Sequence, residues 1–181
     1  MATTFAQMTA EQFEQLPESD RKIELNDGVL VEVEMARAEH ELVKAELILL
    51  LVNALSQSEF MVLVEAMNRL GDRTTRVPDL AIWRRSELKR MPRQRTIVGG
   101  PIIAIEVVSS EAAEDLDEKV QQYFSAGTLA VWVVYPKTRA IRIERPDSAT
   151  RLSIHDSLEA PELFSGLKIA VSEVFSILDG E

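Results

Sequence analysis

Two acidic residues stand where the surrounding sequence is otherwise apolar. Glu106 interrupts the run IIAIEVV (residues 102–108), and Asp79 follows Pro78 at the start of the stretch DLAIW. A carboxylate buried without a partner costs several kcal/mol, so each acid needs a nearby cation, either a basic side chain or a metal ion. Two acids at the ends of neighbouring strands could hold one divalent cation between them, and the carbonyl oxygen of Val107 could be a further ligand.

Lys119 and Glu24 are two more charged residues with informative surroundings. In a helix, at about 100° per residue, Lys119 lies on the flank of an apolar arc made by Leu116, Val120, Tyr123 and Phe124. A lysine turned toward a sheet needs a carboxylate or phosphate partner, although a lysine whose stem lies along the core edge gives the same pattern. Glu24 comes just before a predicted turn and is a further candidate site residue. The alternative interpretation is that it is an ordinary exposed residue of a strand.

The composition limits the chemistry that these residues can support. The chain of 181 residues is 46% hydrophobic and 28% charged, which predicts one folded domain over residues 1–181. The absence of cysteine excludes disulfides, zinc–thiolate sites and thiol catalysis, and two histidines are too few for a His-rich metal centre. A metal site would therefore use mainly carboxylates, which favours Mg²⁺ or Mn²⁺.

Charge is unevenly distributed along the chain. The formal net charge is −10, yet residues 84–95 (RRSELKRMPRQR) carry six basic residues against Glu87 alone. A protein that coats nucleic acid in general would be basic overall, but one basic segment can still hold a phosphate-bearing ligand locally. Arg84, Arg85 and Arg93 are the candidate nucleic-acid contacts, and a solubilising surface loop is the alternative.

The residue patterns predict an ordered series of helices and strands. The expected helices cover residues 9–16, 38–57, 113–126 and 171–178, and the expected strands cover residues 22–25, 29–35, 60–65, 74–77, 79–84, 102–108, 129–135, 140–145 and 168–170. Turns are expected at Asn26-Asp27-Gly28 and at residues 68–72, and the basic segment is expected to be a loop. This order predicts an α/β (α+β) fold in which helices flank a mixed sheet, with an N-terminal helix and hairpins.

The long helix and the N-terminus lead to three further expectations. Residues 47–52 (LILLLV) are apolar nearly all round, so the helix should be buried against the sheet or against a partner subunit, and a homodimer is expected. The helix is too short and too charged at its start to cross a membrane. The first residues lack the basic start and apolar run of a signal peptide, so a cytoplasmic location is expected.

Taken together in order and spacing, several stretches resemble the Uma family of restriction-type endonucleases, within the PD-(D/E)xK nuclease superfamily. The resemblance covers nearly the whole chain and implies a restriction-endonuclease-like core. The matching stretches are KIELNDGVLVE, AEHELVKAELILLL, RVPDLAIW, IAIEVVSS, DEKVQQYFSAGTLAVWVVYPKTRAI and LFSGLKIAVSEVF.

The resemblance implies roles for individual residues. Asp79 and Glu106 would be the metal-binding acids, and Lys119, in the helix, would replace the lysine that the superfamily usually has two residues after the glutamate, where this chain has Val108. Glu24 would complete the metal shell or orient a water, and His40 would have a supporting role near the nucleic acid. The chain departs from the family at Tyr135, where Asp is common, and lacks the proline often found after Ser109.

The expected function is therefore Mg²⁺-dependent hydrolysis of phosphodiester bonds in nucleic acid, with DNA as the expected substrate. An ion held by Asp79 and Glu106 would activate water and neutralise phosphate charge, while Lys119 would assist the attacking water. A catalytically inert binding or regulatory module with the same fold is the main alternative, and the net negative charge favours it. A hydrolase that uses paired carboxylates on sugars is a weaker alternative, because the chain is only 6% aromatic.

Overall fold

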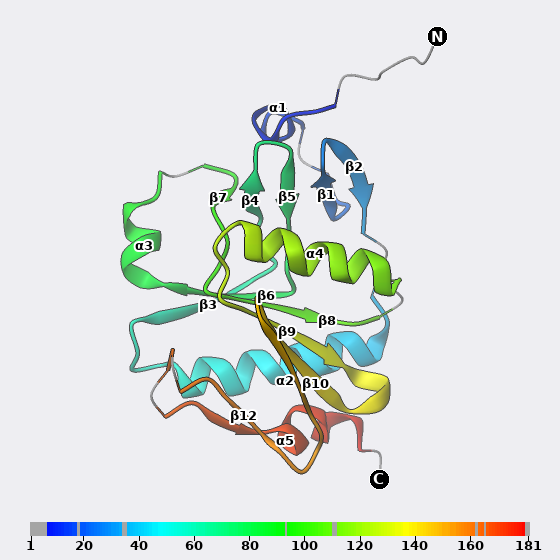
Figure 1. The fold of residues 1–181 in the computed structure, drawn as a ribbon, viewed down its shortest axis with the longest axis vertical. Coiled ribbons are helices and arrows are strands. Elements are labelled where there is room, and N and C mark those ends of the chain that lie inside the picture. Colours follow the sequence, from blue (N-terminus) through cyan, green and yellow to red (C-terminus); the bar gives the residue numbers. More distant parts are fainter. Residues whose placement is uncertain are drawn as a thin grey trace.

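The computed structural model describes residues 7–17, 19–33, 36–92, 94–109, 112–161, 163–164 and 166–179 (Figure 1). Its strands are β1 (Ile23–Asn26), β2 (Val29–Glu32), β3 (Phe60–Val64), β4 (Asn68–Gly71), β5 (Thr74–Arg76), β6 (Leu80–Arg84), β7 (Ile97–Val98), β8 (Ile103–Val107), β9 (Ala130–Tyr135), β10 (Ala140–Arg145), β11 (Ser148–Leu152), β12 (Ser157–Glu159) and β13 (Lys168–Ala170). Its helices are α1 (Ala10–Glu14), α2 (Ala38–Ala54), α3 (Arg85–Arg90), α4 (Ala113–Ser125) and α5 (Val171–Phe175), with short 3-10 helices η1 (Pro136–Thr138) and η2 (Ser176–Leu178).

A mixed six-stranded sheet forms the centre of the molecule, in the order β11-β10-β9-β8-β6-β3. Its strands pair antiparallel except β8 and β9, which are parallel and are connected through α4. Helices α2 and α5 lie on one face of this sheet and α4 lies on the other (Figure 1). The predicted mixed sheet flanked by helices is confirmed.

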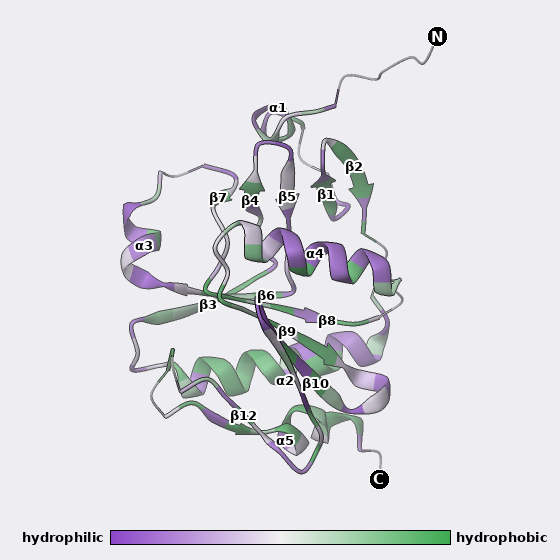
Figure 2. Ribbon diagram, viewed as in Figure 1, coloured by the Kyte–Doolittle hydropathy of each residue, from purple (hydrophilic) through white to green (hydrophobic). Residues whose placement is uncertain are grey.

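Alternation along β8 decides which way the acidic residue faces. Ile103, Ile105 and Val107 belong to the apolar core under α2, whereas Ala104 packs with residues of α4. Side chains alternate between the two faces of a strand, so Glu106 lies on the α4 side with Ala104. The buried residues of α4 pack there, and most of the ribbon of this helix has the colour of hydrophilic residues in Figure 2.

A second sheet, in the order β2-β1-β5-β4-β7, carries the N-terminal hairpin. The turn between β1 and β2 has positive φ at Asp27 (44°) and Gly28 (86°), as expected for Asn-Asp-Gly. The predicted second strand of this hairpin extends to residue 35, but residues 34 and 35 lie outside the described part of the chain.

Two local predictions are wrong, and some strands were not predicted. Residues 68–72 were expected to form a turn because they contain Asn, Gly and Asp, but Asn68–Gly71 is β4, which pairs with β5 and β7. The basic segment contains α3 instead of a continuous loop, since Ser, Glu, Leu, Lys and Arg are compatible with a helix. Strands β7, β11 and β12 have no counterpart among the predicted elements.

Helix α2 is buried along one side only. Leu47 and Leu51 are fully buried against the sheet, whereas Leu49 is 65% exposed and Val52 is 52% exposed. The expectation that this helix is buried against the sheet is therefore confirmed for one side of it. The other side is exposed in the single chain, and a homodimer stays a prediction. Within the described residues, none of the helices is long and apolar enough to cross a lipid bilayer.

Candidate active site

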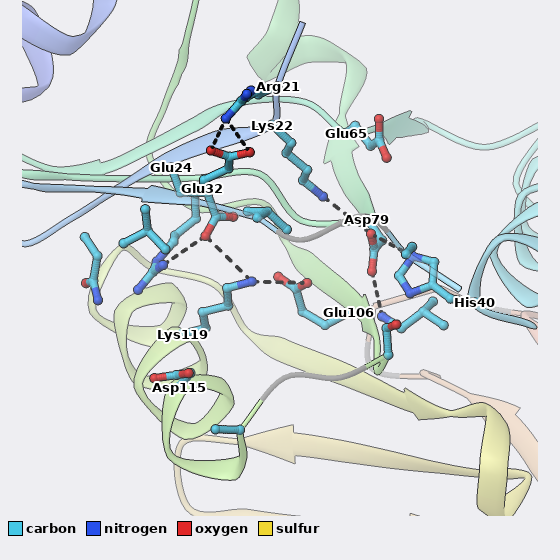
Figure 3. Close-up of a pocket in the computed structure, with 18 of the residues that line it drawn as sticks. Arg21, Lys22, Glu24, Glu32, His40, Glu65, Asp79, Glu106, Asp115 and Lys119 are labelled. Atoms are coloured by element: carbon cyan, nitrogen blue, oxygen red, sulfur yellow. Dashed lines mark hydrogen bonds and ion pairs between the residues drawn. The ribbon is translucent and has the colours of Figure 1, made fainter. Parts of the chain in front are cut away.

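Asp79 and Glu106 come together at the end of two neighbouring strands. The antiparallel register pairs Leu80 with Ile105, so its continuation sets Asp79 opposite Glu106. The N–H of Val107 donates a hydrogen bond of 2.8 Å to Oδ2 of Asp79, which anchors this carboxylate beside β8. Asp79 is 4% exposed and Glu106 is 3% exposed. Two buried carboxylates thus line one cleft (Figure 3).

Helix α4 supplies two neighbours of the Glu106 carboxylate. The hydroxyl of Tyr123 donates a hydrogen bond of 2.7 Å to Oε1, and Nζ of Lys119 lies 3.9 Å from Oε2. Residues 119 and 123 are one helical turn apart, so both side chains point at the same strand. Burial, followed by the charges of Glu106 and Glu24, raises the pKa of Tyr123 well above its usual value, which keeps the hydroxyl protonated and able to donate.

Glu24 lies in a buried network instead of on an exposed strand. The side chain is 1% exposed and accepts hydrogen bonds from Nη1 of Arg76 (2.9 Å) and from the N–H of Val77 (2.9 Å). Nζ of Lys119 lies 3.7 Å from Oε2 of Glu24, so this lysine is shared between Glu24 and Glu106. The four residues that the sequence singled out, Glu24, Asp79, Glu106 and Lys119, all line the same cleft.

His40, Lys22 and Asp79 form a cluster on the other side of the cleft. Nε2 of His40, at the start of α2, lies 3.3 Å from Oδ1 of Asp79, and Nζ of Lys22 lies 3.5 Å from the same atom. Burial by itself would raise the pKa of Asp79, but the hydrogen bond from His40, the charges of Lys22 and His40 and the N–H of Val107 together lower it. Asp79 is therefore held as a carboxylate.

The pKa of His40 offers a direct test of this cluster. Burial lowers it, but the hydrogen bond to Asp79 and the charge of Asp79 outweigh burial, so we expect a pKa above the ordinary histidine value of 6.5. A raised pKa means that this group stabilises the fold below about pH 6.5 and that the contribution is lost as the pH rises through the folded-state pKa.

The measurement is an NMR titration of the imidazole in the presence of a chelator. Replacing His155, the other histidine of the chain, by Asn leaves a single signal to follow. Adding Asp79→Asn is expected to bring the pKa of His40 down. A His40 pKa below 6.5, or one that Asp79→Asn leaves unchanged, would contradict the cluster.

The cleft is strongly acidic, with a volume of about 730 Å³. Among the residues that the structure describes, nine carboxylate residues and four Lys or Arg residues line it, and we call it the acidic cleft: Asp20, Glu24, Glu32, Glu41, Glu65, Asp79, Glu106, Asp115 and Glu118, with Arg21, Lys22, Arg76 and Lys119. Such an excess of negative charge attracts cations and repels a bare phosphate.

The donor chemistry of the acidic cleft suits a hard divalent cation. Among the described residues, no three His, Asp or Glu side chains are grouped as a metal-ligand set. Mg²⁺ usually keeps several waters and needs only one or two protein carboxylates, so Asp79 and Glu106 are sufficient in number and type. The pair therefore fits Mg²⁺ or Mn²⁺ better than zinc, which prefers nitrogen and sulfur ligands.

The structure does not bring the predicted nucleic-acid contacts Arg84 and Arg85 into the acidic cleft. Both lie at the opposite end of β6 from Asp79, about 16 Å along the strand at roughly 3.3 Å per residue. The guanidinium of Arg84 lies 5.5 Å from the centre of the Phe60 ring. Arg93 lies outside the described residues. His40 is the one predicted nucleic-acid contact that lines the acidic cleft within the described part of the chain.

Three residues of the site were missed in the sequence: Arg76, Tyr123 and Lys22. Arg76 is 3% exposed and is the hydrogen-bonding partner of Glu24 and of Gln122 on α4. Tyr123 was assigned only to the apolar arc of the helix. Every buried carboxylate needs a hydrogen-bond donor. A search for donors to Glu24 and Glu106, and not only for metal ligands, could have pointed to these residues.

Comparisons with known proteins identify the family and the fold. A family model described as "Uma2: Putative restriction endonuclease" matches residues 10–172. The crystal structure of "a putative nuclease belonging to DUF820 from Anabaena variabilis ATCC 29413" superposes with a TM-score of 0.83, at 20% sequence identity, covering 94% of this chain and 99% of that one. That structural likeness establishes the fold. A search of curated proteins found no match. Because the family model covers most of its length, the chain belongs to the Uma2 family of restriction-endonuclease-like proteins.

Proposed function

We propose that this protein is a Mg²⁺-dependent endonuclease that hydrolyses phosphodiester bonds, with DNA as its substrate. The observation that carries the proposal is the buried pair Asp79 and Glu106 with Lys119 3.9 Å from Glu106, all lining one cleft. Strong burial of two acids and a lysine in a cleft is costly for stability and is typical of a functional site.

Asp79, Glu106 and the carbonyl oxygen of Val107 would hold the cation. When bound, it would supply Lewis-acid stabilisation of phosphate charge and lower the pKa of water. Lys119 is placed to orient the attacking water and to offset the charge that develops on the phosphate. Glu24 holds Lys119 in position from the other side. The N–H of Val107 and the ring of His40 fix the orientation of Asp79.

The test is cleavage of closed circular DNA by the purified wild-type protein. Mg²⁺ or Mn²⁺ is expected to support conversion of the circle to open and linear forms, and a chelator is expected to abolish it. Circular DNA has no ends, so any cut establishes endonuclease action, and a parallel RNA substrate tests the choice of nucleic acid. If the protein binds Mn²⁺ in calorimetry but does not cleave the DNA, the proposed endonuclease activity is refuted.

A Lys119→Met variant tests the role of the lysine. Because Lys119 contacts carboxylates and is not itself a metal ligand, we expect cleavage to slow by about 10²- to 10⁴-fold while the Kd for Mn²⁺ changes much less. Lys168→Met is the matched control: it removes an exposed lysine 3.0 Å from Glu159, outside the acidic cleft. An equal loss of metal affinity and rate would instead place Lys119 among the groups that hold the ion.

The inert module stays a second candidate because of one observation. The acidic cleft has an excess of carboxylates, which opposes the approach of a polyanion. An inert module predicts no binding of Mn²⁺ or Mg²⁺ in calorimetry, whereas the proposed enzyme binds at least one ion per chain.

A further inference from the structure

Lys22 is the more accessible of the two lysines that line the acidic cleft. It directly precedes β1, and its Nζ lies 3.5 Å from Oδ1 of Asp79 (Figure 3). Its side chain is 26% exposed, whereas that of Lys119 is 8% exposed. Lys22 thus neutralises a proposed metal ligand from the solvent side, while Lys119 is enclosed between Glu24 and Glu106.

The backbone of Lys22 is fixed, but its ammonium group is not. The N–H of Val33 donates a 2.9 Å hydrogen bond to the carbonyl of Lys22, which ties the residue into the base of the β1–β2 hairpin. By contrast, 3.5 Å between Nζ and Oδ1 is longer than a normal hydrogen bond, and the four-carbon stem has freely rotating bonds. The ammonium can therefore leave Asp79 at low cost without moving the strand.

His40 makes the contrast clear. Its ring also contacts Oδ1 of Asp79, at 3.3 Å, but the side chain is 8% exposed and belongs to a long helix. A buried ring on a fixed helix has little room to move away. Of the two cationic neighbours of Asp79, Lys22 is the one free to change partners.

We propose that Lys22 exchanges partners: it pairs with Asp79 in the metal-free protein and with a phosphate of the substrate once a divalent cation occupies the site. This inference rests on the proposed function. A doubly charged ion beside Asp79 repels an ammonium group a few ångströms away. The carboxylates around the acidic cleft keep the lysine nearby, and the incoming phosphate is the anion that it can then neutralise.

The first test is the metal affinity of Lys22→Met. If Lys22 competes for Asp79, the site is open to the ion for only part of the time, and removing the lysine restores full affinity. We expect the Kd for Mn²⁺, measured by calorimetry, to fall by about 3- to 10-fold, which corresponds to an open fraction of about 0.1 to 0.3. Lys168→Met, which removes an exposed lysine paired with Glu159, should leave the Kd unchanged.

The second test measures how the affinity of the protein for a fluorescent oligonucleotide depends on salt concentration. Ca²⁺, which also binds oxygen ligands, is the divalent cation in this experiment. Each phosphate contact contributes about 0.7 to 0.9 to the slope of log K against log salt. In the presence of Ca²⁺, Lys22→Met should weaken binding and should lower the slope by the amount that one phosphate contact contributes. In a chelator, where Lys22 is paired with Asp79, the same substitution should leave the slope unchanged.

The outcomes separate the exchange from the proposed function. An Mn²⁺ affinity of Lys22→Met that equals or falls below that of the wild type overturns the exchange and leaves the enzyme proposal standing. A slope that drops equally in Ca²⁺ and in chelator also overturns it, because Lys22 would then contact phosphate at all times. A wild-type protein that binds neither Mn²⁺ nor oligonucleotide overturns both. Lys22→Gln, with circular dichroism, provides a second variant should Met disturb the hairpin.

Discussion

Replacing Glu106 by Gln is expected to reduce Mg²⁺-dependent cleavage by at least about 10³-fold, since a neutral amide oxygen binds a hard cation much more weakly than a carboxylate does. The substitution preserves shape, and the amide oxygen can still accept the hydrogen bond that Tyr123 donates at 2.7 Å. The loss of attraction to Lys119 is offset by relief of repulsion from Asp79. We therefore expect the free energy of unfolding to change by no more than about 1 kcal/mol.

The assay is initial cleavage rate at saturating Mg²⁺, together with a urea melt. Glu144→Gln is the matched control, because Glu144 is also a glutamate on a central-sheet strand paired with a basic residue, Arg142, but lies outside the acidic cleft. It should retain wild-type rates. Full activity in Glu106→Gln, with nuclease contamination excluded, would contradict the assignment of the site.

Arg76→Met is expected to cause a large loss of stability, about 3–5 kcal/mol in the free energy of unfolding. Arg76 donates to Gln122 at 2.7 Å and to Glu24 at 2.9 Å, and both Arg76 and Glu24 are almost completely buried. Removal of the guanidinium leaves the Glu24 carboxylate inside the protein with Lys119 as its remaining described cationic neighbour, at 3.7 Å.

Arg73→Met is the matched control for this prediction. Arg73 lies 2.7 Å from Asp27, but the two side chains are 45% and 62% exposed, so the loss should be below about 1 kcal/mol. The double variant Arg76→Met/Glu24→Gln should recover much of the lost stability, since the uncompensated charge is gone. Equal losses for Arg76→Met and Arg73→Met in urea denaturation, or additive losses in the double variant, would show that the buried pair is not what stabilises this region.

The candidate site could be found in the sequence because its residues violate local patterns. Glu106 breaks an apolar strand, Asp79 opens another, and Lys119 lies at the edge of an apolar helical arc. Strand alternation and helical periodicity are local rules, so they fix the face on which each residue lies. These rules place Lys119 on the flank of the helix that is turned toward the sheet and Glu106 on one face of its strand, whereas the joint role of the two residues was implied by the family resemblance.

The partners of these residues depend on contacts between distant segments, which local rules do not reach. Arg76 meets Glu24 across 52 positions and Gln122 across 46 positions, and nothing in TTRVP marks the arginine as buried. The β4 strand was misread for a related reason: the sheet partners β5 and β7 override the turn preference of Asn, Gly and Asp. Local patterns also do not show that the candidate nucleic-acid contacts Arg84 and Arg85 lie at the opposite end of β6 from Asp79.

The distribution of the site along the chain has a consequence for how the protein is made. Nζ of Lys119 lies 3.7 Å from Oε2 of Glu24, yet Glu24 belongs to β1 and Lys119 to α4, with β2 through β8 between them in the chain. Strand β9, the parallel partner of β8, follows later still. Contacts of such long range form late in folding. A nascent chain therefore has no complete acidic cleft until α4 and β9 have left the ribosome, so any activity of this site can arise only after most of the chain has been synthesised.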